Sequence, residues 1–160
     1  MNAFDPAALA MLPPAPASLA SSGGVLLGKD YLFDLVRPGI GLYGAHPQPG
    51  FGKNPFAPVA VLRARILQLR QIAKGESVGY GATFRAKRAL RLATLAAGYG
   101  DGVKRALSNR GMAGFAGSRL PIVGRVSMDL TTVDVTSVPA GRIGVGDEME
   151  LLGDIVNLDA

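Results

Sequence analysis

Glycine and proline interrupt this chain so often that few segments are long enough for a long helix. The 160 residues include 22 glycines and 11 prolines, and from residue 57 onward short apolar stretches alternate with turn signals. Many short strands with close turns predict an antiparallel β-barrel or sandwich. The expected strands are APVAVLRARILQLRQI (57–72), LRLATLAAG (90–98), TTVDVT (131–136), GDEMELLGD (146–154) and two short strands around Pro121 in GSRLPIVGRVSM (117–128).

Two details of this β region are predicted locally. Arg63 and Arg65 alternate with apolar residues, and the alternation changes phase at Leu67, which predicts a β-bulge. GVKRALSNRG (102–111) is the one segment after residue 57 with a helical pattern, and Gly111 is placed to cap its end.

The chain differs in character before about residue 50. AALAML (7–12) is suited to the end of a helix, ASLASSGG (17–24) to a strand running into a turn, and LFDLVRPG (32–39) to a second strand. Short buried strands that end in Gly or Ser loops are typical of an α/β barrel. HPQPGFGKNP (46–55) has the composition of a linker. We therefore predict two parts, residues 1–48 and 49–160.

RPGIGLYG (37–44) contains the spacing Gly39-x-Gly41-x-x-Gly44 of a dinucleotide-binding loop. That motif requires a following helix and an acidic residue about 20 positions further on. Four prolines lie within the next 14 residues, and the next acidic residue is Glu76. A Rossmann site is therefore not expected, and the glycines need another explanation.

The composition argues against several classes of function. The net charge of +5 and the sequence pI of 9.9 would attract anions, but the basic residues alternate with apolar ones and no RNA-stacking aromatic motif accompanies them. No apolar run reaches the roughly 20 residues of a membrane span, so we expect neither nucleic acid nor membrane as a partner. Without cysteine, with a single histidine, His46, in the linker, and with only one acid in GYGDG (98–102), we expect no metal site and an exposed His46.

The order of five motifs is similar to that of the alanine racemases, a family of pyridoxal-phosphate enzymes. The motifs are SLASSGGVLLGKDYLFDLVRPGIGLYG, SVGYGATFRA, LAAGYGDGVKR, PIVGRVSMDLTTVDVT and VGDEMELLG. The resemblance implies a mainly β fold, in which residues 1–48 are the last strands of a (β/α)₈ barrel and residues 49–160 are most of a C-terminal antiparallel β domain. It also implies a cytoplasmic homodimer with alanine as substrate, acting in D-alanine supply for peptidoglycan.

The resemblance assigns the cofactor contacts to the first part. Ser22, Gly39 and Ile40 correspond to residues that contact the phosphate of pyridoxal phosphate, between two barrel loops where phosphates often bind. The family usually has asparagine where this chain has Ser21. Arg37 corresponds to the arginine that faces the pyridine nitrogen. A guanidinium keeps its protons and acts only as a hydrogen-bond donor. Facing it, the ring nitrogen would stay unprotonated.

The remaining site residues belong to the second part. Tyr80, in VGYGATF, corresponds to the catalytic tyrosine that works opposite the cofactor lysine, contributed across the dimer. Met128, in VSMDL, corresponds to a residue whose backbone N–H meets the substrate carboxylate, and Tyr99 to a tyrosine beside the substrate's access route.

The cofactor lysine lies, by resemblance, in a barrel segment that precedes these residues, and no lysine of this chain occupies that motif. We therefore expect a fragment that is inactive alone. Three alternatives stay open at this point: a non-catalytic β module that mediates association, a related racemase acting on serine, and a basic nucleic-acid-binding barrel.

Overall fold

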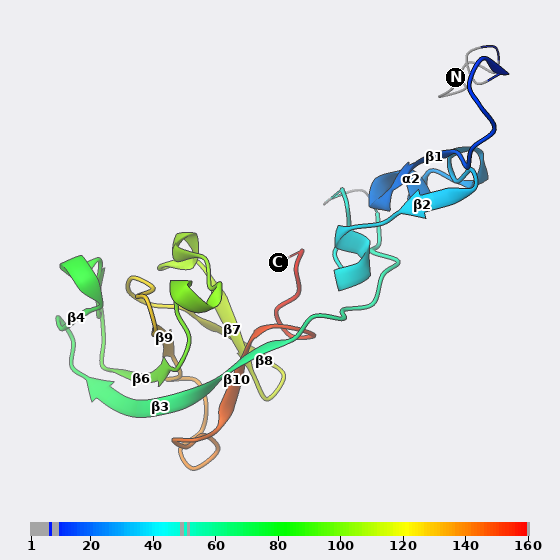
Figure 1. Cartoon of the computed structure of the whole chain (residues 1–160). Helices are drawn as coiled ribbons and strands as arrows, with labels where there is room; N and C mark the ends of the chain where they lie inside the picture. Colours follow the sequence, from blue (N-terminus) through cyan, green and yellow to red (C-terminus); the bar gives the residue numbers. More distant parts are fainter. Residues whose placement is uncertain (1–6, 8–9, 49, 51, 160) are drawn as a thin grey trace. The chain divides into compact units, whose positions relative to one another are not determined.

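The computed structural model describes residues 7, 10–48, 50 and 52–159 (Figure 1). The chain divides into two compact units, residues 1–59 together with Asp159, and residues 60–158. We call them the first and the second unit and describe each by itself.

The first unit contains a pair of parallel strands. Its elements are β1 (Ser18–Ser21), α2 (Ser22–Leu26), β2 (Leu35–Arg37) and the 3₁₀ helices Lys29–Tyr31 and Ile40–Tyr43. β1 pairs with β2, and Ser21 lies opposite Arg37 at the end of both strands. The expected helix over 7–12 includes positions 8 and 9, which lie outside the described residues.

The second strand starts later than the apolar run predicts. Phe33 takes a left-handed backbone conformation with φ 51°, and the Asp34 carboxylate accepts the Ala17 N–H at 2.9 Å. The left-handed conformation of Phe33 interrupts strand geometry, and β2 begins only at Leu35.

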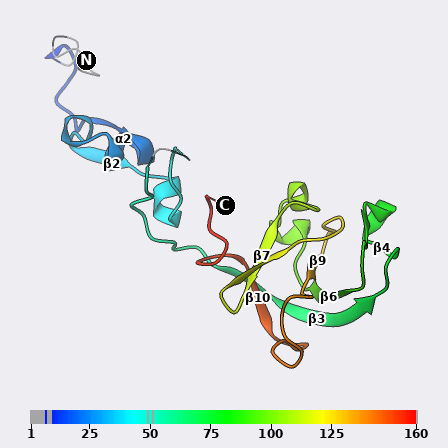
Figure 2. The same ribbon diagram turned by 180° about the vertical axis from the view of Figure 1, so that it is seen from behind.

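The second unit is built on a six-stranded sheet in the order β8-β7-β10-β3-β6-β9, with antiparallel pairing between neighbours. β3 is the long curved strand in Figures 1 and 2. The strands are β3 (Leu62–Ile72), β6 (Leu90–Leu95), β7 (Met112–Phe115), β8 (Ser118–Pro121), β9 (Thr131–Asp134) and β10 (Glu148–Leu152), beside a separate hairpin of β4 (Ser77–Val78) and β5 (Phe84–Arg85).

A contact beyond β8 brings the two ends of the sheet together. Ile122 forms an isolated bridge with Val133 of β9, and Val123 N–H donates to Thr132 O at 2.9 Å. The sheet therefore curls into a barrel, and the expected antiparallel β architecture is confirmed. Only one of the two strands expected around Pro121 forms, because the chain after β8 makes a single bridge instead of a ladder.

The predicted bulge is present. Ile66 pairs with Leu95, whereas Gln68 pairs with Thr94, so Leu67 is the extra residue on β3. Its side chain is exposed, which is the outcome that the phase change in the sequence indicated.

The helix predicted for 102–111 is wrong: only the 3₁₀ helix Arg105–Leu107 forms there. Ser108 Oγ accepts the N–H of Val126, and Asn109 Oδ1 accepts the N–H of Gly124. These bonds to a distant segment replace helical ones. Gly111 is needed for space instead of capping, since a methyl group there would stand 2.8 Å from Leu107 Cβ.

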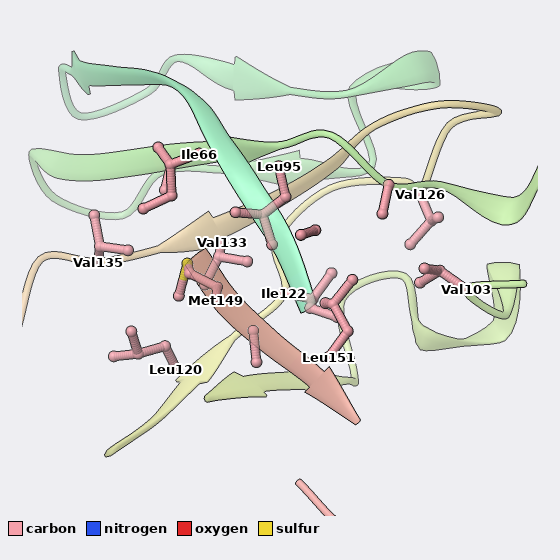
Figure 3. Packing of buried hydrophobic residues seen from close by; sticks show 14 of the residues in the cluster. Ile66, Leu95, Val103, Leu120, Ile122, Val126, Val133, Val135, Met149 and Leu151 are labelled. Atoms are coloured by element: carbon pink, nitrogen blue, oxygen red, sulfur yellow. The ribbon is translucent and has the colours of Figure 1, made fainter. Parts of the chain in front are cut away.

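The main core fills the interior of the barrel. Figure 3 shows Ile66, Leu95, Val133 and Met149, from four different strands, within one cluster. Each is at most 1% exposed. A second cluster of Ile72, Val78, Ala86, Leu90, Leu92 and Val123 packs where the β4–β5 hairpin joins the sheet.

Candidate functional site

In the first unit, two loops follow neighbouring parallel strands and come together at the strand ends. Directly after β1 the chain enters α2 at Ser22, and shortly after β2 it enters the 3₁₀ helix at Ile40. Because Ser21 and Arg37 are paired and the strands are parallel, both loops leave the same end of the strand pair. Backbone N–H groups at such an end suit an anion.

Ser22 ties the two loops together. Its side chain is 4% exposed, and its Oγ accepts N–H bonds from Gly39 at 2.8 Å and from Gly41 at 3.1 Å. The hydroxyl proton is not used in these bonds and can be donated to an anion. Among the described residues no acceptor is found for the Ile40 N–H. The arrangement brings Ser22, Gly39 and Ile40 together at the strand ends. The Gly39 N–H itself donates to Ser22 Oγ in this structure.

The later glycines of the 37–44 motif are required by close packing inside the unit. A methyl group at Gly41 would lie 3.1 Å from the Phe56 ring. Gly44 has φ +91°, and a methyl group there would lie 2.4 Å from Ala57 O. Among the described residues the motif itself forms the 3₁₀ helix Ile40–Tyr43 and no α-helix follows it, so a dinucleotide-type loop is not found here.

Arg37 is held at the end of β2 by Ser18. Its Nη1 donates to Ser18 O at 3.1 Å and also to Ser18 Oγ. Within the described part of the chain these are its recorded hydrogen bonds, so Nε and Nη2 remain available as donors. The guanidinium is therefore held in place through Nη1, and Nε and Nη2 can donate to a ligand.

The prediction that His46 is exposed is wrong. His46 is only 7% exposed, its N–H donates to Asp159 Oδ1 at 2.9 Å, and its Nδ1 accepts the N–H of Gln48 at 3.0 Å. The ring satisfies the backbone of a proline-containing turn, which explains its burial. Among the described residues no cluster of three metal-ligating side chains is found.

Tyr80, in the second unit, begins a 3₁₀ helix (Tyr80–Ala82) between β4 and β5. Gly79 and Gly81 on either side have φ values of 75° and 73°, which an L side chain rarely adopts. This turn presents Tyr80 with 72% of its surface exposed. The ring lines a pocket of about 460 Å³ together with Gln68, Gly79, Thr94, Arg125, Ser127, Leu130 and Thr132.

Arg125 is a site residue that the sequence reasoning missed. A methyl group in place of the Gly81 hydrogen would stand 3.8 Å from the Arg125 guanidinium, so the cation lies beside the Tyr80 turn. Its signal in the sequence was a cation three residues before Met128 in the same motif. The two segments lie 45 residues apart, and only the folded barrel brings them together.

Tyr99 and Met128 come from two loops joined through their backbones. Tyr99 N–H donates to Ser127 O at 2.9 Å, and Gly100 N–H to Met128 O at 2.8 Å. The Met128 N–H has no recorded acceptor in the part that the structure describes, and Met128 is 57% exposed. Since Ser127 also lines the pocket of Tyr80, Tyr80, Tyr99 and Met128 lie on neighbouring loops.

Asp101 has a structural role in this arrangement. One of its carboxylate oxygens accepts the Gly98 N–H at 2.9 Å and closes the 98–101 turn. A methyl group at Gly98 would lie 2.3 Å from Ser127 O, so the turn and the Met128 loop are in direct backbone contact.

Comparison with known proteins agrees with this arrangement. The family described as "Alanine racemase, C-terminal domain" matches residues 59–159, and "Alanine racemase, N-terminal domain" matches residues 1–47. Alanine racemase of Brucella canis is 51% identical over 159 residues, covering 92% of this chain and 40% of the relative. A catabolic alanine racemase of Rhizobium johnstonii is 53% identical over 136 residues.

Solved structures show the same likeness. The alanine racemase of Bartonella henselae, with covalently bound pyridoxal phosphate, has a TM-score of 0.82 at 46% identity, covering 94% of this chain and 42% of that one. The biosynthetic enzyme of Pseudomonas aeruginosa has a TM-score of 0.84 at 38% identity. The chain thus spans about two fifths of the length of these relatives. With both regional matches in order along it, the chain belongs to the alanine racemase family.

Proposed function

We propose that this chain contributes the cofactor-phosphate end of a barrel and the tyrosine-bearing β domain to an enzyme that interconverts L-alanine and D-alanine. Residues 1–48 form the barrel part and residues 49–160 the β domain. The observation that carries the proposal is the exposure of Tyr80, which stands open at a pocket with Arg125 and the Met128 loop close by. A tyrosine that only filled a core would be buried.

The first unit fits the phosphate and ring nitrogen of pyridoxal phosphate. Ser22 Oγ and the Ile40 N–H are available donors, and Gly39, which precedes Ile40, is tied to Ser22 by its own N–H. Arg37 offers open guanidinium donors at the adjoining strand end. The bound cofactor would supply the electron sink that acidifies the hydrogen on Cα. Arg37 would hold the ring nitrogen unprotonated, since a guanidinium keeps its own protons.

The second unit supplies the residues for the substrate. Tyr80 Oη would remove or return a proton on one face of Cα, opposite a lysine that belongs to the rest of the protein. The Met128 N–H would bind the alanine carboxylate, and Tyr99 would border the access route. Arg125 contributes a guanidinium to the pocket that the Tyr80 ring lines.

The activity requires more than this chain. We propose a cytoplasmic homodimer in which Tyr80 and Arg37 of one chain serve different active sites, with the racemase supplying D-alanine to peptidoglycan. Among the described residues no helix is long and apolar enough to cross a bilayer. Alone, the chain would be inactive and would act at most as an association module, which its self-contained barrel core supports.

A chimaera tests the proposal. Residues 1–160 would replace the matching stretch of the Bartonella henselae enzyme, to which they are 46% identical. We expect racemisation, and we expect Tyr80→Phe to slow deuterium exchange on one Cα face by about 100-fold or more, the usual size of an acid–base contribution. Exchange on the other face should persist.

Tyr31→Phe is the matched control, because Tyr31, in the 3₁₀ helix Lys29–Tyr31, is not among the proposed cofactor or substrate contacts and the change should leave both exchange rates unaffected. Equal exchange on both faces in Tyr80→Phe would contradict the assignment. The unfused chain, incubated with pyridoxal phosphate and L-alanine, should form no D-alanine, and clear turnover would contradict the fragment proposal.

A further inference from the structure

Two backbone segments meet directly beside Tyr80, with a glycine at each point of contact. A methyl group at Gly79 would lie 2.8 Å from Arg125 N, and one at Gly124 would lie 2.9 Å from Val78 O. Both glycines have left-handed φ values, 75° and 77°. The Tyr80 turn and the Arg125 segment therefore touch backbone to backbone, and a small displacement of either would change the pocket.

The hairpin is anchored at its base, where Val78 and Phe84 pack in the second core cluster, whereas the Tyr80–Ala82 turn between them lies outside that cluster. The hairpin that carries it has only two residues in each strand, β4 and β5, and Tyr80 itself is largely exposed. Short hairpins are marginal without outside contacts. The orientation of the phenol must then depend on contacts that reach the turn from elsewhere.

Asn109 makes such a contact on both sides. Its Oδ1 accepts the Gly124 N–H at 2.6 Å, and its Nδ2 donates to Thr83 Oγ1 at 3.2 Å. Thr83 directly follows the Tyr80–Ala82 helix. One side-chain amide thus links the Arg125 segment to the turn that carries Tyr80.

The neighbouring residue reinforces one end of this link. Ser108 Oγ accepts the Val126 N–H at 3.0 Å and donates to Arg105 O at 2.6 Å. Ser108 and Asn109 together hold the residues on both sides of Arg125. Asn109 has φ 58°, a left-handed conformation that asparagine tolerates better than most residues. Its side chain forms hydrogen bonds through both Oδ1 and Nδ2.

We propose that Asn109 is a positioning residue that sets the place of the Tyr80 turn relative to the Arg125 segment. This inference rests on the proposed role of Tyr80 and adds a residue that touches no substrate. Asparagine suits the task because its amide carries both a donor for Thr83 and an acceptor for Gly124. Displacements of about 1 Å are enough to impair a reacting group.

The test follows the phenol directly in the 160-residue chain. The four tyrosines are labelled with 3-fluorotyrosine and assigned by Tyr→Phe variants, and their ¹⁹F resonances are recorded. Asn109→Gly, which removes both side-chain bonds, and Thr83→Val, which removes the acceptor for Asn109, should each shift and broaden the Tyr80 resonance. Thr83→Ser keeps the hydroxyl and should restore the parent signal.

Non-additivity sharpens the result. If Thr83 acts through its bond to Asn109, Asn109→Gly combined with Thr83→Val should move the Tyr80 signal no further than Asn109→Gly alone. The Tyr31 and Tyr43 signals should stay in place. Asn109→Gly tolerates the backbone conformation and lacks both bonds, so in that variant the Gly124 amide resonance should move as well.

An unchanged Tyr80 resonance in both single variants, fully additive shifts, or failure of Thr83→Ser to restore the signal would overturn the inference. The readout does not depend on racemisation. Normal two-face exchange in the Tyr80→Phe chimaera would therefore refute the proposed function while the fluorine spectra still decided whether Asn109 positions the turn.

Discussion

The two units differ in how much of their own apolar surface they bury. Both core clusters lie in the second unit, whereas the only buried apolar residues described in the first are Ala20 and Ala45. More than half of the large apolar side chains that are exposed belong to the first unit, Leu26, Leu27, Leu35, Leu42 and Tyr43 among them. Parallel strands normally need cover on both faces. The second unit is thus a closed barrel, and the first is part of a larger structure.

The largest effect should come from opening a cavity in the barrel. Leu95 is fully buried, so Leu95→Ala should lower the free energy of unfolding by about 3 kcal/mol, the usual cost of such a truncation. Leu35→Ala removes the same atoms from a side chain that is 56% exposed. It should change the free energy of unfolding by less than about 0.5 kcal/mol. Urea unfolding followed by circular dichroism measures both. Similar losses in the two variants would show that the units do not differ as described.

Limited proteolysis should also distinguish the first unit from the second. Trypsin should cut after Lys29 and Lys53 about tenfold faster than after the cations on β3, because local opening is easier where little apolar surface is buried. Mass spectrometry over a time course gives the order of cuts. Early cleavage at Arg63 or Arg65 would contradict the comparison, since both lie on a strand paired on both sides.

The smallest effect on stability should follow removal of the Ser22 hydroxyl. Ser22→Ala leaves the N–H groups of Gly39 and Gly41 without their acceptor, so their amide resonances should shift. Resonances of the barrel core should not move, because the core lies in the other unit. Ser21→Ala is the matched control, since that exposed side chain makes no recorded cap bond to α2. Equal shifts in both variants would argue against Ser22 as the link between the loops.

The features that the sequence predicted correctly were those determined by residues close to one another in the chain. Alternation in β3 and its change of phase at Leu67 follow from which side chains must face the barrel interior. Motif order indicated the family, and the structural likeness agrees with it.

Predictions failed where distant segments compete with local preference. The helical pattern of 102–111 is lost to bonds from Ser108 and Asn109 to residues 15 to 18 positions away. His46 looks like a linker residue, yet it is buried, and its backbone N–H donates to Asp159, 113 positions further along. Arg125 could not be connected with Tyr80 because nothing local relates two loops 45 residues apart.

Sequence alone determined that this chain is mainly β, where its turns lie and which family it resembles, because side-chain alternation and glycine conformations act over short distances. Tertiary structure decided which loops meet. Closure of the sheet through Ile122 and Val133 brings the Arg125 segment against the Tyr80 turn, and Asn109 links them. The physical reason is that hydrogen bonds between distant segments form only once the barrel has placed their donors and acceptors within about 3 Å.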